Sequence, residues 1–201
     1  MTQRTTRVML VDDHTLVREG IRHILQGTPG FEVIAEAGDG ETALRLAQST
    51  RPDLVVLDLS LPGLSGLEVT TRIRESLPEI RVLILSVHDH QEYVLGAVRA
   101  GAQGYLRKDT SPAELREALQ AVARGESYFS PPVARHLSAA VRGEPSTADA
   151  GSRLDRLTPR ERLGLSPRTV ESYRESLARK LDIKTVAGLT RFAIEEGLVR
   201  E

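Results

Sequence analysis

The sequence predicts an α/β protein, a doubly wound five-stranded parallel sheet followed by a small all-α unit. Short apolar runs alternate with amphipathic segments five times in about the first 125 residues, as in parallel sheets with crossover helices. The run at 54–57 is continuously apolar, which is typical of a strand buried on both faces. Acidic residues follow two of the runs, where such sheets carry their reactive groups.

The first two strand–helix pairs are separated by clear breaks. A short apolar run predicts a strand over Val8–Val11, and apolar residues at helical spacing predict a helix over 14–26, which a Thr-Pro-Gly break ends. A second strand is expected over 31–35. A second helix is expected over 39–49, with its Ala and Leu residues on one face.

The third strand, Leu54–Leu57, ends on a single carboxylate. Asp58 follows the apolar run, and Pro62 and Gly63 turn the chain shortly afterwards. Removing a carboxylate from water costs more free energy than its packing returns. A lone Asp58 at the end of a buried strand therefore indicates a functional group, and the alternative is a turn or helix-cap role.

The same alternation continues to about residue 124. Helices are expected over 64–76, 91–100 and 111–124, and strands over 81–87 and 104–106. The last helix has a complete start signal, since a Ser cap is followed by Pro at the first helical position and by Glu three residues after the cap.

We expect one domain over residues 1–126, a linker over 127–153 and a second domain over 154–201. The linker prediction rests on a Pro pair and a run rich in Gly, Ser and Pro, which are typical of flexible connections. A short helix over 133–141 is compatible with that linker.

Composition and charge narrow the class of protein. The whole chain has a formal net charge of −1, but residues 152–201 carry a net charge of +3, which hints at an anionic partner for the C-terminal part. The sequence has no cysteine, which fits a reducing cytoplasm and excludes disulfide chemistry. No window is long and apolar enough to suggest a signal peptide or a membrane span.

Polar residues follow the expected strands at the edge of the sheet where strand ends meet. These residues are Asp12, Asp13, Asp58, Ser86 and Lys108. Three carboxylates in one pocket repel one another unless a cation neutralises them. Oxygen donors favour Mg²⁺, and no His or Cys lies at a spacing that suggests zinc. Taken singly, Lys108 fits a surface lysine and Ser86 a strand-end cap.

Four motifs match a known family in order: VDDH at 11–14, LDLSLPGLSG at 57–66, ILSVHD at 84–89 and GYLRKD at 104–109. Over about residues 5–125 the chain resembles the receiver domain of bacterial two-component response regulators. The resemblance implies that Asp58 accepts a phosphoryl group from a sensor histidine kinase. It also implies that Asp12, Asp13, Asp58 and the backbone carbonyl of Ser60 hold Mg²⁺.

The same resemblance implies a switch around the acceptor. Ser86 would bond a phosphoryl oxygen, Lys108 would pair with the anion, and Tyr105 would be the aromatic residue whose rotamer changes. Alone, Tyr105 fits a core or interface residue equally well. Asp109 departs from the family pattern, because many receivers have Pro after the lysine.

The C-terminal segment 163–199 resembles the LuxR-type (NarL/FixJ) helix-turn-helix domain, with SPRTVESYRESLARKL at 166–181 as the recognition helix. The resemblance implies that polar residues of this helix face promoter DNA, some toward phosphates and some toward base edges. They are Arg168, Thr169, Glu171, Ser172, Arg174 and Lys180. The alternative is an amphipathic helix with a solvated charged face.

The C-terminal domain departs from its family between Arg162 and Leu163. Family members carry about twenty further residues there, which form most of one helix and the positioning helix of the motif. In this chain LTPRER runs directly into LGLSPRTV. Either the molecule lacks this segment, or the sequence as written omits a segment that the molecule has. A single helical turn cannot bury an apolar stripe, so we expect weak or absent sequence-specific DNA binding from the chain as written.

The sequence thus predicts a cytoplasmic response regulator that forms a homodimer on phosphorylation and regulates transcription. One alternative is a receiver that acts by protein contacts and carries a remnant of a DNA-binding domain. A second alternative is an aspartyl-phosphate phosphatase, but those enzymes need an acidic residue two positions after the nucleophile, where this chain has Ser60. We therefore expect no enzymatic turnover.

Overall fold

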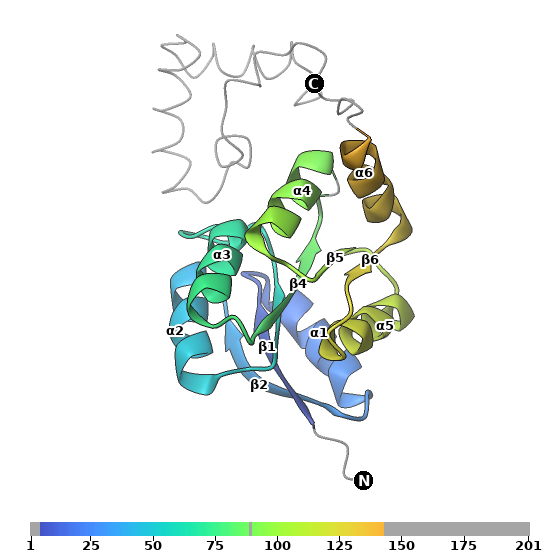
Figure 1. The fold of residues 1–201 in the computed structure, drawn as a ribbon. Coiled ribbons are helices and arrows are strands. Elements are labelled where there is room, and N and C mark those ends of the chain that lie inside the picture. The colour runs from blue at the N-terminus through green and yellow to red at the C-terminus, as the bar shows by residue number, and fades with distance from the viewer. Residues whose placement is uncertain (1–4, 89, 143–201) are drawn as a thin grey trace, which may run out of the picture. The chain divides into compact units, whose positions relative to one another are not determined.

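A computed structural model describes residues 5–88 and 90–142 of the chain (Figure 1). Its strands are β1 (Thr6–Val11), β2 (Phe31–Ala37), β3 (Leu54–Leu57), β4 (Arg81–Ser86), β5 (Gly104–Arg107) and β6 (Tyr128–Phe129). Its helices are α1 (Thr15–Gln26), α2 (Gly40–Thr50), α3 (Gly66–Ser76), α4 (Gln91–Ala100), α5 (Pro112–Ala123) and α6 (Pro131–Val141). Every strand and helix expected up to residue 124 is present, with ends that differ by at most two residues.

The strands form one parallel sheet in the order β2-β1-β3-β4-β5-β6. The order reverses direction at β1 and β3, which lie side by side with Val11 opposite Leu57. The backbone N–H of Asp58 donates to the carbonyl of Val11 across 2.8 Å. The residues that follow β1 and β3 are therefore placed together at the switch point of the sheet, where ligands of such folds bind.

Alternate strand residues face two separate apolar cores, and helices cover both faces of the sheet (Figure 1). Leu10 and Val56 face the core that α1 and α5 cover, whereas Met9, Val55 and Leu57 face the core that α2, α3 and α4 cover. The period of two along each strand produces this division. Because both faces are covered, β3 is buried along its whole length, as its continuous apolar run predicts.

The sheet has one strand more than the five that the sequence predicts. Gly125, with φ of +88°, turns the chain after α5, and β6 then pairs in parallel with β5, with Tyr128 opposite Gly104. A two-residue strand has too few positions to show an apolar period, so its sequence does not reveal it.

The segment from Pro131 to Val141 lies inside the predicted linker but forms helix α6. Val133 is fully buried in the core under α4, and α6 packs against α4. The Pro pair that suggested a flexible connection instead begins a helix, where a fixed φ and a missing N–H cost little. Helix α6 thus packs on the first domain inside the range expected for the linker, and the domain boundaries stay a prediction.

Two local features position the loop after β3 that carries Asp58. Ser65 caps α3 by accepting a hydrogen bond from the backbone N–H of Glu68. Gly66 begins the helix so close to the preceding loop that a Cβ atom there would lie 2.1 Å from the carbonyl oxygen of Asp58. Only glycine fits at that contact, which holds the loop tightly against the start of α3.

The predicted recognition helix and the expected gap between Arg162 and Leu163 lie outside the described residues. Within the part of the chain that the structure describes, none of the helices has the length and apolar character needed to cross a bilayer.

Candidate functional site

Asp58 lies at the centre of a polar cluster at the carboxyl ends of the strands. It follows β3 and is 2% exposed. Its Oδ2 atom accepts a hydrogen bond from Nζ of Lys108 across 2.8 Å. Its Oδ1 atom is buried and has no hydrogen-bond partner of normal geometry among the described residues. The structure thus leaves one acceptor oxygen of Asp58 available in a closed environment.

Lys108 also joins Asp12 to the cluster. Its Nζ atom lies 2.6 Å from Oδ2 of Asp12, and both side chains are largely buried. The backbone N–H of Lys108 donates to the carbonyl of Ser86 across 2.8 Å, which ties the residue after β5 to the end of β4. One ammonium group is therefore shared by two carboxylates from different strands.

Burial and charge shift the pKa values of this pair in the same direction. Desolvation raises the pKa of Asp58, and the like charge of Asp12 adds to that effect, while Lys108 and the backbone amide of Ser60 oppose it. Burial alone would lower the pKa of Lys108, but its ion pairs with Asp12 and Asp58 outweigh burial and raise it. Lys108 is therefore held as a cation at neutral pH.

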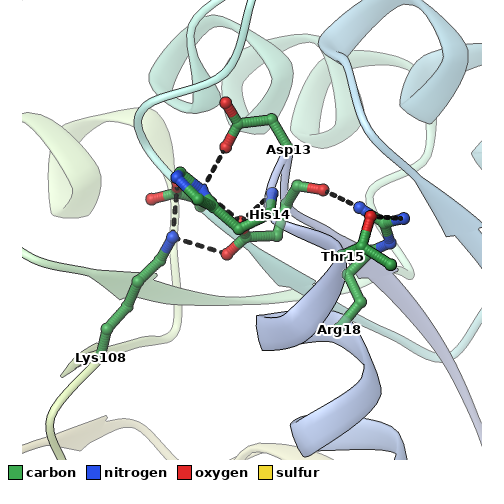
Figure 2. A network of polar contacts seen from close by, with 7 residues as sticks. Asp13, His14, Thr15, Arg18 and Lys108 are labelled. Carbon is green, nitrogen blue, oxygen red and sulfur yellow. Dashed lines mark hydrogen bonds and ion pairs between the residues drawn. The ribbon is translucent and has the colours of Figure 1, made fainter.

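Asp13 and His14 complete the cluster on its exposed side (Figure 2). Nδ1 of His14 lies 2.6 Å from Oδ1 of Asp13 and 3.2 Å from Oδ1 of Asp12. One ligand atom each from Asp12, Asp13, His14 and Asp58 lies within 4.8 Å of the others. The sequence did not single out His14, but the turn after β1 brings its ring back onto the two aspartates.

Arg18 is a second residue of this neighbourhood that the sequence did not single out (Figure 2). Its Nη1 atom donates to the carbonyl of Asp12 across 2.6 Å, and its Nε atom donates to Oε2 of Glu36 across 3.1 Å. Its place one helical turn after His14 was the available signal, since the first turn of α1 faces the end of β1.

The remaining candidates come from the loop after β3, from β4 and from β5. Ser60 is half-buried in the loop after β3. Ser86 is fully buried at the end of β4, where its hydroxyl accepts from the backbone N–H of His88 across 3.1 Å. Tyr105 on β5 is also fully buried, and its hydroxyl donates to the carbonyl of His88 across 2.5 Å. Ser86 and Tyr105 thus bind the N–H and the carbonyl of the same residue, His88, after β4.

The structure does not describe the candidate DNA-contacting residues. Arg168, Thr169, Glu171, Ser172, Arg174 and Lys180 lie outside the described residues.

The donor set of the pocket fits a divalent cation. Asp12, Asp13 and Asp58 place three carboxylates against the single ammonium group of Lys108. The unpaired Oδ1 of Asp58 is a buried acceptor that a cation would satisfy. Oxygen-rich pockets of this kind bind hard ions that keep part of their water shell.

A doubly wound sheet with this acidic edge defines the receiver class of α/β domains, and the family model of the response regulator receiver domain matches residues 8–120. MctR, a transcriptional regulatory protein of Rhizobium johnstonii, is 38% identical over 218 residues, covering 99% of this chain and 98% of MctR. The nitrate/nitrite response regulator NarL of Escherichia coli K12 is 37% identical over 181 residues, covering 90% of this chain and 83% of NarL.

A solved structure agrees with these relatives. The crystal structure of a LuxR-family two-component response regulator from Aurantimonas sp. SI85-9A1 is 43% identical to this chain, with a TM-score of 0.65 over 69% of this chain and 99% of that one. The chain therefore belongs to the response regulators of two-component systems, of the NarL/LuxR type.

Proposed function

We propose that this protein is a phosphorylation-controlled regulator of transcription whose acceptor is Asp58. A sensor histidine kinase would supply the phosphoryl group, and phosphorylation would promote a homodimer. The observation that carries the proposal is the state of the Asp58 carboxylate, which is buried, bound to Lys108 through Oδ2 and unpaired at Oδ1.

The transfer is a substitution at phosphorus. One carboxylate oxygen of Asp58 forms a bond to phosphorus while the bond from phosphorus to the kinase histidine breaks, and the histidine nitrogen keeps the electron pair of that bond and is protonated from solvent. Asp12, Asp13, Asp58 and the backbone carbonyl of Ser60 would hold Mg²⁺, which when bound would neutralise charge on the phosphoryl oxygens. Lys108 is placed to bind the same oxygens, because its Nζ atom lies 2.8 Å from Oδ2 of Asp58.

A switch can follow from the contacts of Ser86. Its hydroxyl accepts from the backbone N–H of His88, and a rotation of the side chain to donate to a new phosphoryl oxygen would release that contact. The freed segment includes the carbonyl that Tyr105 binds, and the ring of His88 stacks on Tyr93 of α4 with ring centroids 4.7 Å apart. Phosphorylation would thereby bias the packing of α4, as expected for a switch between two arrangements of one domain.

Transcription regulation is the role of the relative MctR by its description as a transcriptional regulatory protein. The alignment with MctR extends over 218 residues, which is longer than this whole chain of 201 residues. MctR therefore has residues without a counterpart here, which supports the gap expected between Arg162 and Leu163. We propose that promoter binding by Arg168, Thr169, Glu171, Ser172, Arg174 and Lys180 is weak in the chain as written.

The MctR residues without a counterpart in this chain favour a second candidate function. A receiver that lacks a complete helix-turn-helix would act through protein contacts alone. Multiple-turnover hydrolysis is not expected of either candidate, because Ser60 stands where a phosphatase of this type needs an acid. The cytoplasmic location stays a prediction.

Intact-mass measurement of the full chain, before and after acetyl phosphate with Mg²⁺, tests the acceptor. One phosphoryl adduct is expected, and it should disappear in Asp58→Ala but persist in Asp53→Ala, which changes an aspartate outside the site. An absent adduct in the wild type, or an adduct that survives Asp58→Ala, would refute the proposal. The unmodified mass also tests the gap, since a value of 22.1 kDa shows that the chain is as written.

DNA binding decides between the two candidate outputs. Nanomolar, sequence-selective affinity of the full chain for a promoter fragment would support the transcription factor. Affinity that is weak and independent of sequence would support the receiver that acts by protein contacts.

A further inference from the structure

We propose that the ion pair between Arg107 and Asp109 holds Lys108 in place, and that this pair thereby sets how fast Asp58 accepts a phosphoryl group. The inference deepens the proposed function and rests on it. It makes Arg107 and Asp109 positioning residues, which act on the reaction through Lys108. It also gives a role to Asp109, the residue at which this chain departs from many receivers.

Arg107 and Asp109 bind each other at two points. Nε of Arg107 donates to Oδ1 of Asp109 across 2.8 Å, and Nη2 donates to Oδ2 across 2.7 Å. A guanidinium that binds a carboxylate through two parallel hydrogen bonds fixes orientation as well as distance. The hydrogen bonds from Arg107 lower the pKa of Asp109, so both partners are charged at neutral pH.

The pair spans a turn in which Lys108 is the second residue. The backbone N–H of Thr110 donates to the carbonyl of Arg107 across 3.2 Å, which makes residues 107–110 a hydrogen-bonded turn. Strand β5 ends at Arg107 and α5 begins at Pro112, so Lys108 lies outside both elements. Because the pair joins the first and third residues of the turn, it restrains the backbone of the residue between them.

The ammonium group of Lys108 needs such a restraint. Its Nζ atom lies 2.6 Å from Oδ2 of Asp12 and 2.8 Å from Oδ2 of Asp58 (Figure 2). A lysine reaches its partners through a flexible four-carbon stem, so the position of Nζ depends on the backbone from which the stem starts. The carbonyl of Ser86 binds the backbone N–H of Lys108 on one side, and the Arg107–Asp109 pair restrains the turn on the other.

Position and charge predict opposite effects for the loss of Asp109. A phosphoryl donor is an anion, so removal of a nearby negative charge would speed phosphorylation if only the electrostatic field mattered. If the pair positions Lys108, the same removal slows phosphorylation, because Lys108 stabilises charge on the phosphoryl oxygens only where it is held. The direction of the change in Asp109→Asn therefore separates the two explanations.

The chain offers a matched control pair after α5. Nε of Arg124 donates to Oε1 of Glu126 across 3.0 Å, and Nη2 donates to Oε2 across 2.7 Å. This pair has the same spacing of two residues and the same two-point contact as the first one. It lies at the other end of α5 from the turn of Lys108, so Glu126→Gln removes a similar pair without touching that turn.

The test measures the rate at which the phosphoryl adduct forms, by intact mass with acetyl phosphate and Mg²⁺, in full-length wild type and variants. Asp109→Asn should react about two- to fivefold more slowly, which is the range for loss of a partly exposed ion pair. Arg107→Lys keeps the charge but loses the two-point contact, so it should slow the reaction similarly. Glu126→Gln should match the wild type.

A second measurement does not depend on phosphorylation. The chain has no lysine besides Lys108, Lys180 and Lys184, so the ammonium signal of Lys108 can be followed by nitrogen NMR. Hydrogen bonds to two carboxylates slow the exchange of its protons with water. We expect faster exchange in Asp109→Asn and Arg107→Lys and no change in Glu126→Gln. Thermal unfolding verifies that each variant keeps its fold.

An equal or higher phosphorylation rate in Asp109→Asn would overturn the proposal, as would an unchanged ammonium signal or an equal slowing in Glu126→Gln. These outcomes are separable from those of the proposed function. If the wild type forms no adduct on Asp58 but Asp109→Asn frees the ammonium group of Lys108, the positioning role stands and the acceptor role fails. If Asp58 is phosphorylated equally fast in both proteins, the reverse holds.

Discussion

The guanidinium of Arg18 binds the backbone carbonyl of Asp12 across 2.6 Å, so that helix α1 holds the loop that carries the acidic residues. The same side chain reaches Glu36 on β2 and Oγ1 of Thr15. The end of β1 is therefore anchored to the helix that follows it and to the neighbouring strand. Arg18 touches neither Asp58 nor Lys108 in these contacts, which makes it a positioning residue.

Replacing Arg18 with Met should weaken Mg²⁺ binding without unfolding the protein. A hydrogen bond from a charged group contributes about 1.5–3 kcal/mol, and loss of the anchor lets Asp12 and Asp13 move. We expect roughly tenfold weaker Mg²⁺ binding in calorimetry and a matching rise in the Mg²⁺ concentration needed for phosphorylation. Arg22→Met is the control, because Arg22 is exposed and lies 4.0 Å from Glu36. Identical Mg²⁺ affinity in both variants would contradict this role.

Replacing Asp58 with Asn should stabilise the fold at neutral pH. The pKa of Asp58 is raised by burial, so the folded chain keeps this proton to a higher pH than the unfolded chain. Rising pH therefore lowers stability from the ordinary pKa of 3.8 up to the raised value, and the loss is complete above it. Asn removes that loss, and we expect a gain on the order of 1 kcal/mol.

Urea unfolding of the wild type and Asp58→Asn from about pH 4 to about pH 8 measures this difference. The difference in free energy of unfolding between Asp58→Asn and the wild type should widen with pH and then level off. Asp109→Asn is the control, because its exposed carboxylate has a pKa that Arg107 lowers, so its effect should have the opposite sign and be small. A constant gap across the range would show that Asp58 does not titrate as its burial implies.

Two glycine-to-alanine substitutions should act in opposite directions. A Cβ atom at Gly66 would lie 2.1 Å from the carbonyl oxygen of Asp58, whereas one at Gly20 in α1 meets nothing within 4 Å. Gly66→Ala should cost about 3 kcal/mol or more and reduce phosphorylation, since the loop of Asp58 must move. Gly20→Ala should stabilise the protein by about 0.5–1 kcal/mol. Denaturant melts of both variants decide, and similar stabilities would contradict the tight contact.

The segment after residue 126 should contribute to the stability of the first domain. Val133 of α6 is fully buried in the core that also includes Val94 and Ala97 of α4. Val133→Ala should therefore lower the free energy of unfolding by about 2 kcal/mol. Val98→Ala on the exposed side of α4 is the matched control, because Val98 is 38% exposed. Equally small effects of both substitutions would show that α6 contributes little to the stability of the first domain.

The parts of the fold that the sequence predicts are those that depend on period and burial. Leu54–Leu57 is recognisable because a strand covered on both faces must be apolar throughout, and the parallel order then places Asp12, Asp58 and Lys108 at one edge. The direct contact of Lys108 with both carboxylates follows from that order once the strands are aligned.

The parts that escaped prediction depend on short-range geometry. His14 joins the pocket through one turn of backbone, which no spacing rule describes, and Arg18 reaches Asp12 through a long side chain whose rotamer only packing fixes. Tyr128 and Phe129 pair with β5 over two residues, and the buried position of Val133 behind a Pro pair is set by the helix beneath it.

The two outer strands of the sheet limit its pairing with a second sheet. Its outer strands are β6, with two residues, and β2. Outer strands expose unpaired N–H and C=O groups that can capture another chain. After Phe129 the chain leaves the sheet, and α6 begins at Pro131. On the other side β2 carries the exposed residue Glu32, which would meet a like charge in a second copy. The outer strands therefore offer little backbone for pairing with a second sheet, which works against continuous sheets or fibres.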